Sequence, residues 1–225
     1  MQTTISHGFQ AKENRRRLIA MAMIAIVSLS LDWWLSANPS LRRTDYRAIN
    51  AVTALVLYAL LTPVARHDLG LRLLPAQGLR YWLRVGTILT AIMVVIGVGG
   101  MAILTSGHHW RDAEHVPTTP PEAIIDRFFV MCLEAPILEE LLYRMIVCVP
   151  IAAVSPALAI AVSGILFAAL HFAYGNPGPD NFLAGYLLAW TYLKSGTILV
   201  PIALHASGNA IALGFQVGAW YVLYG

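Results

Sequence analysis

Seven apolar stretches separated by short polar linkers follow one another along the chain. They cover Leu18–Leu35, Ala48–Val64, Trp82–Thr105, Glu122–Ile151, Pro156–Phe172, Phe182–Leu193 and Thr197–Tyr224. A helix that crosses a bilayer needs about 20 mainly apolar residues, and most of these stretches approach that length. The pattern therefore predicts an all-α protein, a polytopic membrane helix bundle of about seven (six to eight) transmembrane helices.

The linkers contain the residues that end helices. They cover Asn38–Tyr46, Ala65–Leu79, Ser106–Pro121 and Ala173–Asn181, and they are rich in Pro, Gly, Arg or His. The segment from Pro150 to Pro156 predicts a tight turn, so the fourth and fifth stretches form a hairpin. Within the fourth stretch, Glu134 precedes Pro136, which we expect to bend or break the helix, and this gives Glu134 a local structural role.

Composition agrees with a membrane location. The chain is 58% hydrophobic and only 12% charged, with a mean hydropathy of +0.65, whereas soluble domains carry about 25% charged residues. The net charge of +3 would suggest a nucleic-acid partner in a soluble protein. Here the basic residues flank apolar stretches, so we expect the lipid bilayer as a partner and no nucleic acid.

The distribution of Lys and Arg predicts an orientation. With the N-terminus inside, the inner segments hold nine of these residues and the outer segments four. The outer four are Arg42, Arg43, Arg47 and Arg111. Because basic residues favour the cytoplasmic side, the count predicts a multi-pass plasma membrane protein, in a bacterial inner membrane, with a cytoplasmic N-terminus.

Charged residues inside an apolar stretch are the most informative, because each costs about 2.5–3.5 kcal/mol at the centre of a membrane helix. The fourth stretch holds Glu139, Glu140 and Arg144. Glu140 and Arg144 are four residues apart, so they share a helix face and predict an ion pair. Glu139 lies about 100° around the helix. It is left without a partner by this pairing and is therefore the better candidate for chemistry.

Two later stretches carry polar groups at depths compatible with Glu139. His171 shares a helix face with Phe167, and His205 shares one with Asn209. A glutamate and a histidine that converge on one water can remove its proton and create a nucleophile for a carbonyl carbon. A second histidine and an asparagine can donate hydrogen bonds to the oxyanion that develops.

These residues form three spaced motifs. They read Glu139-Glu140-Leu-Leu-Tyr-Arg144, Phe167-Ala-Ala-Leu-His171 and His205-Ala-Ser-Gly-Asn209. In this order and in separate apolar stretches, the motifs resemble EExxxR, FxxxH and HxxxN of the CAAX protease and bacteriocin-processing family of intramembrane proteases, relatives of the prenyl-protein endopeptidases. The resemblance covers roughly residues 122–212.

The resemblance implies roles for the motif residues. Glu139 and His171 would activate water, and His205 with Asn209 would form the oxyanion hole. Glu140 and Arg144 would be a supporting pair, and Phe167 is most simply a packing residue.

The need for a metal stays open at this level. Members of the family are often described as metalloproteases, and zinc accepts both histidine and carboxylate ligands. A zinc site here would use Glu139, His171 and His205. The chain has no HExxH sequence, and we favour a mechanism without a cofactor.

The sequence therefore predicts an intramembrane endopeptidase that cuts near the C-terminus of a peptide or membrane-anchored protein. The alternatives are a zinc-dependent version of this protease and a non-catalytic immunity or transport protein whose polar core binds a ligand. We expect a single membrane domain over residues 1–225, with N-terminal helices of unassigned role in residues 1–120 and a catalytic core in residues 122–212. Neither the substrate nor the oligomeric state follows from the residues.

Overall fold

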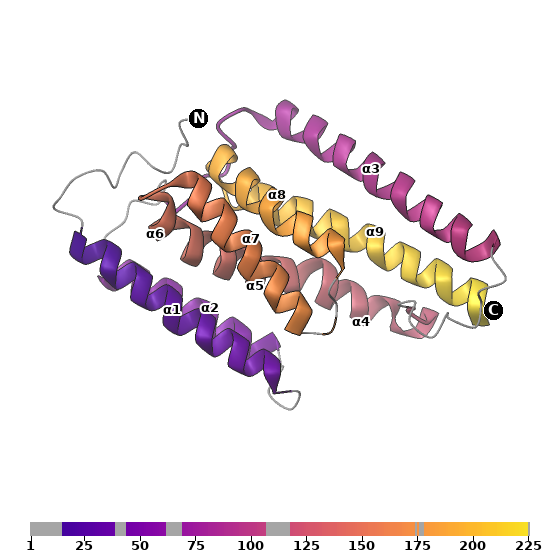
Figure 1. Cartoon of the computed structure of the whole chain (residues 1–225), viewed down its shortest axis with the longest axis horizontal. Coiled ribbons are helices and arrows are strands. Elements are labelled where there is room, and N and C mark those ends of the chain that lie inside the picture. The colour runs from indigo at the N-terminus through magenta and orange to yellow at the C-terminus, as the bar shows by residue number, and fades with distance from the viewer. Residues whose placement is uncertain are drawn as a thin grey trace. The chain divides into compact units, whose positions relative to one another are not determined.

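The computed structural model describes residues 15–38, 44–61, 69–106, 118–173, 175 and 178–224. Every regular element in these ranges is a helix, and they contain no strand (Figure 1). The elements are α1 (Arg15–Ala37), α2 (Thr44–Leu61), α3 (Leu79–Ser106), η4 (Pro121–Ala123), α4 (Ile124–Phe128), η5 (Phe129–Glu134), α5 (Ala135–Glu140), η6 (Leu141–Cys148), α6 (Val149–Ala152), α7 (Pro156–Ala173), α8 (Pro179–Ser195) and α9 (Leu199–Tyr224). The all-α prediction is confirmed.

Each predicted apolar stretch coincides with one helix or with a run of helices. By length and composition, four helical segments of the described chain can cross a membrane. They are Arg16–Leu35, Leu79–Ala102, Pro156–Ala173 and Leu199–Tyr224. These segments support a membrane location, whereas the total of about seven crossings stays a prediction.

The fourth stretch is helical from Pro121 to Ala152 and contains two π-helical segments, η5 and η6. Of the expected bend or break at Pro136, the break is wrong, because the helix continues through this residue. Proline lacks the N–H that an α-helix needs, and a wider turn with i→i+5 bonding can accommodate the change. The π-helical segment η5 ends at Glu134, directly before the turn that contains Pro136.

The helices fall into two compact units, and the expectation of one membrane domain stays a prediction. The first unit contains residues 1–78 and 137–202, and the second contains residues 79–136 and 203–225. In the first unit α1 and α2 lie side by side, and η6 packs against α1, α2, α7 and α8 (Figure 1). The side chains of η6 are buried from Leu142 to Cys148, so this segment forms the centre of the unit.

Glycines allow α7 and α8 to approach closely in the first unit. A Cβ atom on Gly185 would lie 2.8 Å from the carbonyl oxygen of Gly164, and a Cβ atom on Gly164 would lie 2.8 Å from the ring of Tyr186. Small residues are used in this way where helices pack in a membrane. The contact fixes α7, which carries His171.

A turn at Gly196 separates α8 from α9. Gly196 adopts a left-handed conformation with φ of 68° and closes α8 by donating its N–H to the Tyr192 carbonyl. Leu69 and Gly70 pack here, because the Tyr192 hydroxyl donates to the Leu69 carbonyl at 2.8 Å and the Ile198 N–H donates to the Gly70 carbonyl at 2.8 Å.

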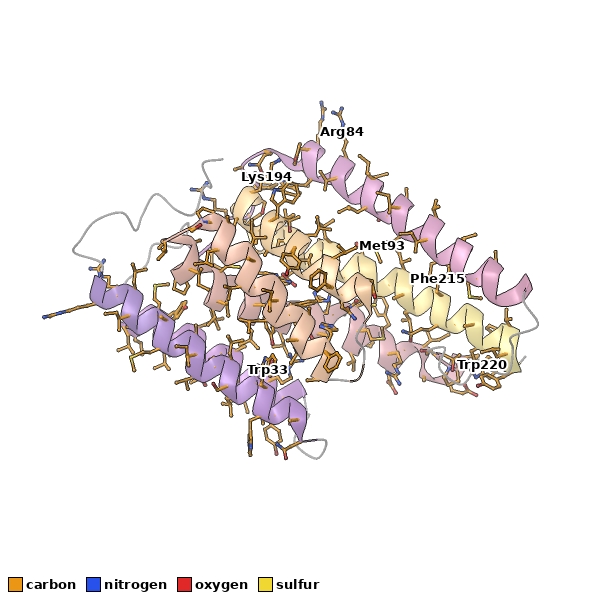
Figure 2. All side chains as sticks on the ribbon, viewed as in Figure 1. Trp33, Arg84, Met93, Lys194, Phe215 and Trp220 are labelled. Atoms are coloured by element: carbon orange, nitrogen blue, oxygen red, sulfur yellow. The ribbon has the colours of Figure 1, made fainter. Side chains whose placement is uncertain are left out.

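In the second unit α3 packs along α9. The Met93 side chain of α3 lies over Gly208, and the Phe215 ring of α9 lies over Gly97 (Figure 2). Close to the start of η4, the Thr119 hydroxyl donates to the Gln216 side-chain oxygen at 2.9 Å.

Candidate functional site

The predicted pair of Glu140 and Arg144 is present and fully buried. Arg144 Nε donates to Glu140 Oε2 at 2.7 Å, and its Nη2 donates to Oε1 at 3.3 Å. The third nitrogen, Nη1, donates to Ser163 Oγ on α7 at 2.7 Å, and Ser163 donates in turn to the Tyr143 carbonyl at 2.9 Å. Arg144 therefore joins its own segment, η6, to α7.

Glu139 points to another side of the helix, as its position predicted, but it is not left without a partner. Arg47 Nη1 of α2 lies 3.5 Å from Glu139 Oε1. Arg47 is itself held by Asp32 of α1, through Nε to Oδ1 at 2.7 Å and Nη2 to Oδ2 at 3.2 Å. The expectation of an unpaired Glu139 is wrong, because α2 begins at Thr44 and carries Arg47 into the buried interior of the first unit.

Sequence reasoning missed Asp32 and Arg47, although a signal was present. Asp32 is the acidic residue of an otherwise apolar stretch, and Arg47 comes directly after the next linker. In two helices joined by a short linker, side chains near the linker can face one another. Opposite charges at such positions indicate a pair.

His171 is hydrogen-bonded to its own helix. Its Nδ1 lies 3.0 Å from the carbonyl oxygen of Phe167. Because a carbonyl can only accept a hydrogen bond, Nδ1 is the donor of this bond, and in the neutral imidazole the lone pair is then on Nε2. The spacing of four residues between Phe167 and His171 makes the bond geometrically accessible. In this neutral form His171 presents Nε2 as a nitrogen that can accept a proton.

The Phe167 ring contacts three side chains of the first two motifs. Its ring lies 4.5 Å from the His171 ring and 5.8 Å, edge to face, from the Tyr143 ring. The guanidinium carbon of Arg144 lies 4.8 Å from the centre of the same ring, which is a cation–π distance. Phe167 thus positions His171 against the buried pair of the first motif.

One chain of contacts joins Glu139 to His171. The Tyr143 hydroxyl donates to Asp32 Oδ2 at 3.5 Å, and Asp32 binds the arginine that contacts Glu139. On its other side, Tyr143 reaches His171 through the Phe167 ring. The first unit therefore places the carboxylate of the first motif and the imidazole of the second in one connected network.

The third motif lies on the part of α9 that belongs to the second unit. Asn209 Nδ2 donates to the Met131 carbonyl of η5 at 2.6 Å, so this amide clamps α9 to a π-helical segment. π-Helical segments are rare and frequent at functional sites. A primary amide has two N–H groups, and the bond to Met131 uses one of them. The convergence of His205 and Asn209 with Glu139 stays a prediction.

Within the part of the chain that the structure describes, no three His, Cys, Asp or Glu side chains gather as metal ligands would. The preference for a metal-independent mechanism stays a prediction.

Comparison with known proteins identifies one family. Residues 121–211 match the family described as Type II CAAX prenyl endopeptidase Rce1-like. No curated protein and no solved structure matches the chain. All three motifs lie within the matched segment, so the resemblance inferred from them is confirmed over these residues. The matched family is one of endopeptidases, and the match covers 91 of the 225 residues of the chain.

Proposed function

Because residues 121–211 match the type II CAAX prenyl endopeptidases, we propose that this protein is an intramembrane endopeptidase. Its substrate is a peptide or membrane-anchored protein that is cut near its C-terminus. One observation carries the proposal. Glu139 and His171 belong to one contact network of the first unit, in which the carboxylate faces Arg47 and the neutral imidazole, bonded through Nδ1, has Nε2 as its proton acceptor.

In the proposed reaction a water molecule binds between Glu139 and His171. These groups take its proton as the oxygen attacks the carbonyl carbon of the peptide bond. His205 and Asn209 donate hydrogen bonds to the oxyanion of the tetrahedral intermediate. The same acid–base groups return a proton to the leaving nitrogen, and the C–N bond breaks without a covalent enzyme intermediate.

The contact between Arg47 and Glu139 supports the metal-independent version. A guanidinium 3.5 Å from Oε1 repels a second cation at the same carboxylate, and the repulsion is strong in a medium of low dielectric constant. Zinc would need this carboxylate together with His171 and His205 to complete three protein ligands.

The proposal is tested with purified protein in liposomes. The probes are internally quenched peptides that end in Cys-aliphatic-aliphatic-X, with and without a prenyl group on the cysteine. We expect the wild type to cut near the C-terminus, and His171→Ala to lower kcat by about 100-fold because a proton acceptor is lost. Incubation with a zinc chelator is expected to leave the rate unchanged. Mass spectrometry locates the cut.

Glu134→Gln is the matched control, because Glu134 is an exposed carboxylate of the same stretch outside the motifs. It is expected to retain the wild-type rate. A rate lost on chelation and restored by zinc would establish the metal-dependent protease instead. Equal cleavage by wild type and His171→Ala would remove the assigned role of the histidine, and a wild type without turnover would favour a ligand-binding immunity or transport protein.

A further inference from the structure

Asp32 and Arg47 lie outside the segment matched by the family, on helices whose role the sequence left unassigned. We propose that this pair positions Glu139 for the reaction. Asp32 holds Arg47 in place, and Arg47 holds the carboxylate. The inference rests on the proposed function and gives the N-terminal helix pair α1–α2 a part in it.

The planar guanidinium of Arg47 fixes the direction of its contact with Glu139. A guanidinium is a rigid plane with donors in fixed directions. Two of its nitrogens bind the two oxygens of Asp32, at 2.7 and 3.2 Å. Once two nitrogens are fixed the direction of the third is fixed too, and this third nitrogen faces Glu139 Oε1 at 3.5 Å.

The three charged side chains of this contact are buried. The side chains of Asp32, Arg47 and Glu139 are 0, 9 and 5% exposed. In such surroundings an ionised carboxylate depends on a neighbouring cation, since bulk water stabilises it little. The set places one guanidinium between two carboxylates, so the position of Arg47 governs both.

Two neighbouring polar side chains of the motif bind other groups. Arg144 directs its three nitrogens to Glu140 and Ser163. Tyr143 presents its hydroxyl to Asp32. Arg47 is the guanidinium that contacts Glu139, and Asp32 is the group that orients it.

A purely structural role makes a different prediction. If the pair only joined α1 to α2, any substitution that kept the helices together would keep the activity. The same helices share a second polar contact about one turn away, in which Ser28 Oγ donates to Asn50 Oδ1 at 3.1 Å and Asn50 Nδ2 donates to the Ser28 carbonyl at 2.9 Å. This contact provides a matched control.

The experiment measures kcat and KM on the quenched peptides, per mole of folded protein, for Arg47→Gln, Arg47→Lys and Asn50→Ala. We expect Arg47→Gln to lower kcat by about 100-fold with little change in KM, since a displacement of about 1 Å has effects of this size. Arg47→Lys keeps the charge but loses the fork, so it is expected to recover part of the rate. Asn50→Ala is expected to melt at a lower temperature and to retain the wild-type kcat.

A charge exchange separates positioning from helix pairing. The double substitution Asp32→Arg with Arg47→Asp restores opposite charges between α1 and α2 but turns a carboxylate toward Glu139. We expect the exchanged protein to remain as slow as Arg47→Gln. Full activity of the exchanged protein, or wild-type kcat in Arg47→Gln, would overturn the inference and leave the proposed protease standing.

If Arg47→Gln does not fold, Arg47→Lys decides, and an unchanged kcat in that variant overturns the inference. Equal rates for wild type and Glu139→Gln would instead remove the proposed function itself.

Discussion

Glu139→Gln is expected to lower kcat for peptide cleavage by about 10³-fold or more, because general acid–base groups contribute about 10²–10⁴-fold to catalysis. Glutamine keeps the size of the side chain and an oxygen that can accept from Arg47. The carboxylate that takes the proton of water is lost. The measurement is the initial rate of cleavage of the quenched peptides in liposomes, with the folded fraction determined on the same sample.

The result is specific if Glu134→Gln stays at the wild-type rate in the same preparation. A loss of less than about tenfold in Glu139→Gln would show that this carboxylate is not the acid–base group, since the lower end of such effects is about 10²-fold.

Arg144→Met is expected to have the largest effect on stability. Arg144 and Glu140 are both fully buried, and the arginine also binds Ser163 and faces the Phe167 ring. Methionine fills similar space but leaves Glu140 as an uncompensated charge, which costs about 3–5 kcal/mol of unfolding free energy. Denaturant or thermal unfolding in detergent measures the change.

The double variant Glu140→Gln with Arg144→Met is the control for this explanation. Removing both members of a buried ion pair is far less damaging than removing one, so we expect most of the lost stability to return. Wild-type stability of Arg144→Met would contradict the account, as would a double variant no more stable than the single one.

The helices were predictable because hydropathy reports membrane helices directly. The stretch predicted as Leu18–Leu35 is α1, Arg15–Ala37, and the stretch predicted as Pro156–Phe172 is α7, Pro156–Ala173. Hydropathy carries no information on hydrogen-bond register, however. The π-helical segments on both sides of α5 were therefore not foreseen, and Pro136, expected to bend or break the helix, lies within a continuous one.

Within the site, local pairs were predictable and distant ones were not. The Glu140–Arg144 pair follows from a spacing of four residues on one helix. The contact of Arg47 with Glu139 joins residues 92 positions apart, and it depends on how α1 and α2 pack against the helix that carries Glu139. The orientation count treats Arg47 only as a basic residue of an outer segment. It does not consider that a buried arginine needs a partner of opposite charge.

The proposed reaction requires the imidazoles of His171 and His205 to lie near one peptide bond, and short-range cross-linking measures this directly. The chain's two cysteines are replaced through Cys132→Ala and Cys148→Ala, and His171→Cys with His205→Cys is treated with a short bifunctional thiol reagent in membranes. Ser28→Cys with Asn50→Cys is the positive control, because those side chains are 3.1 Å apart. We predict intramolecular cross-linking of the 171–205 pair comparable to the control. Efficient linking of the control without any linking of the 171–205 pair would contradict a shared active site.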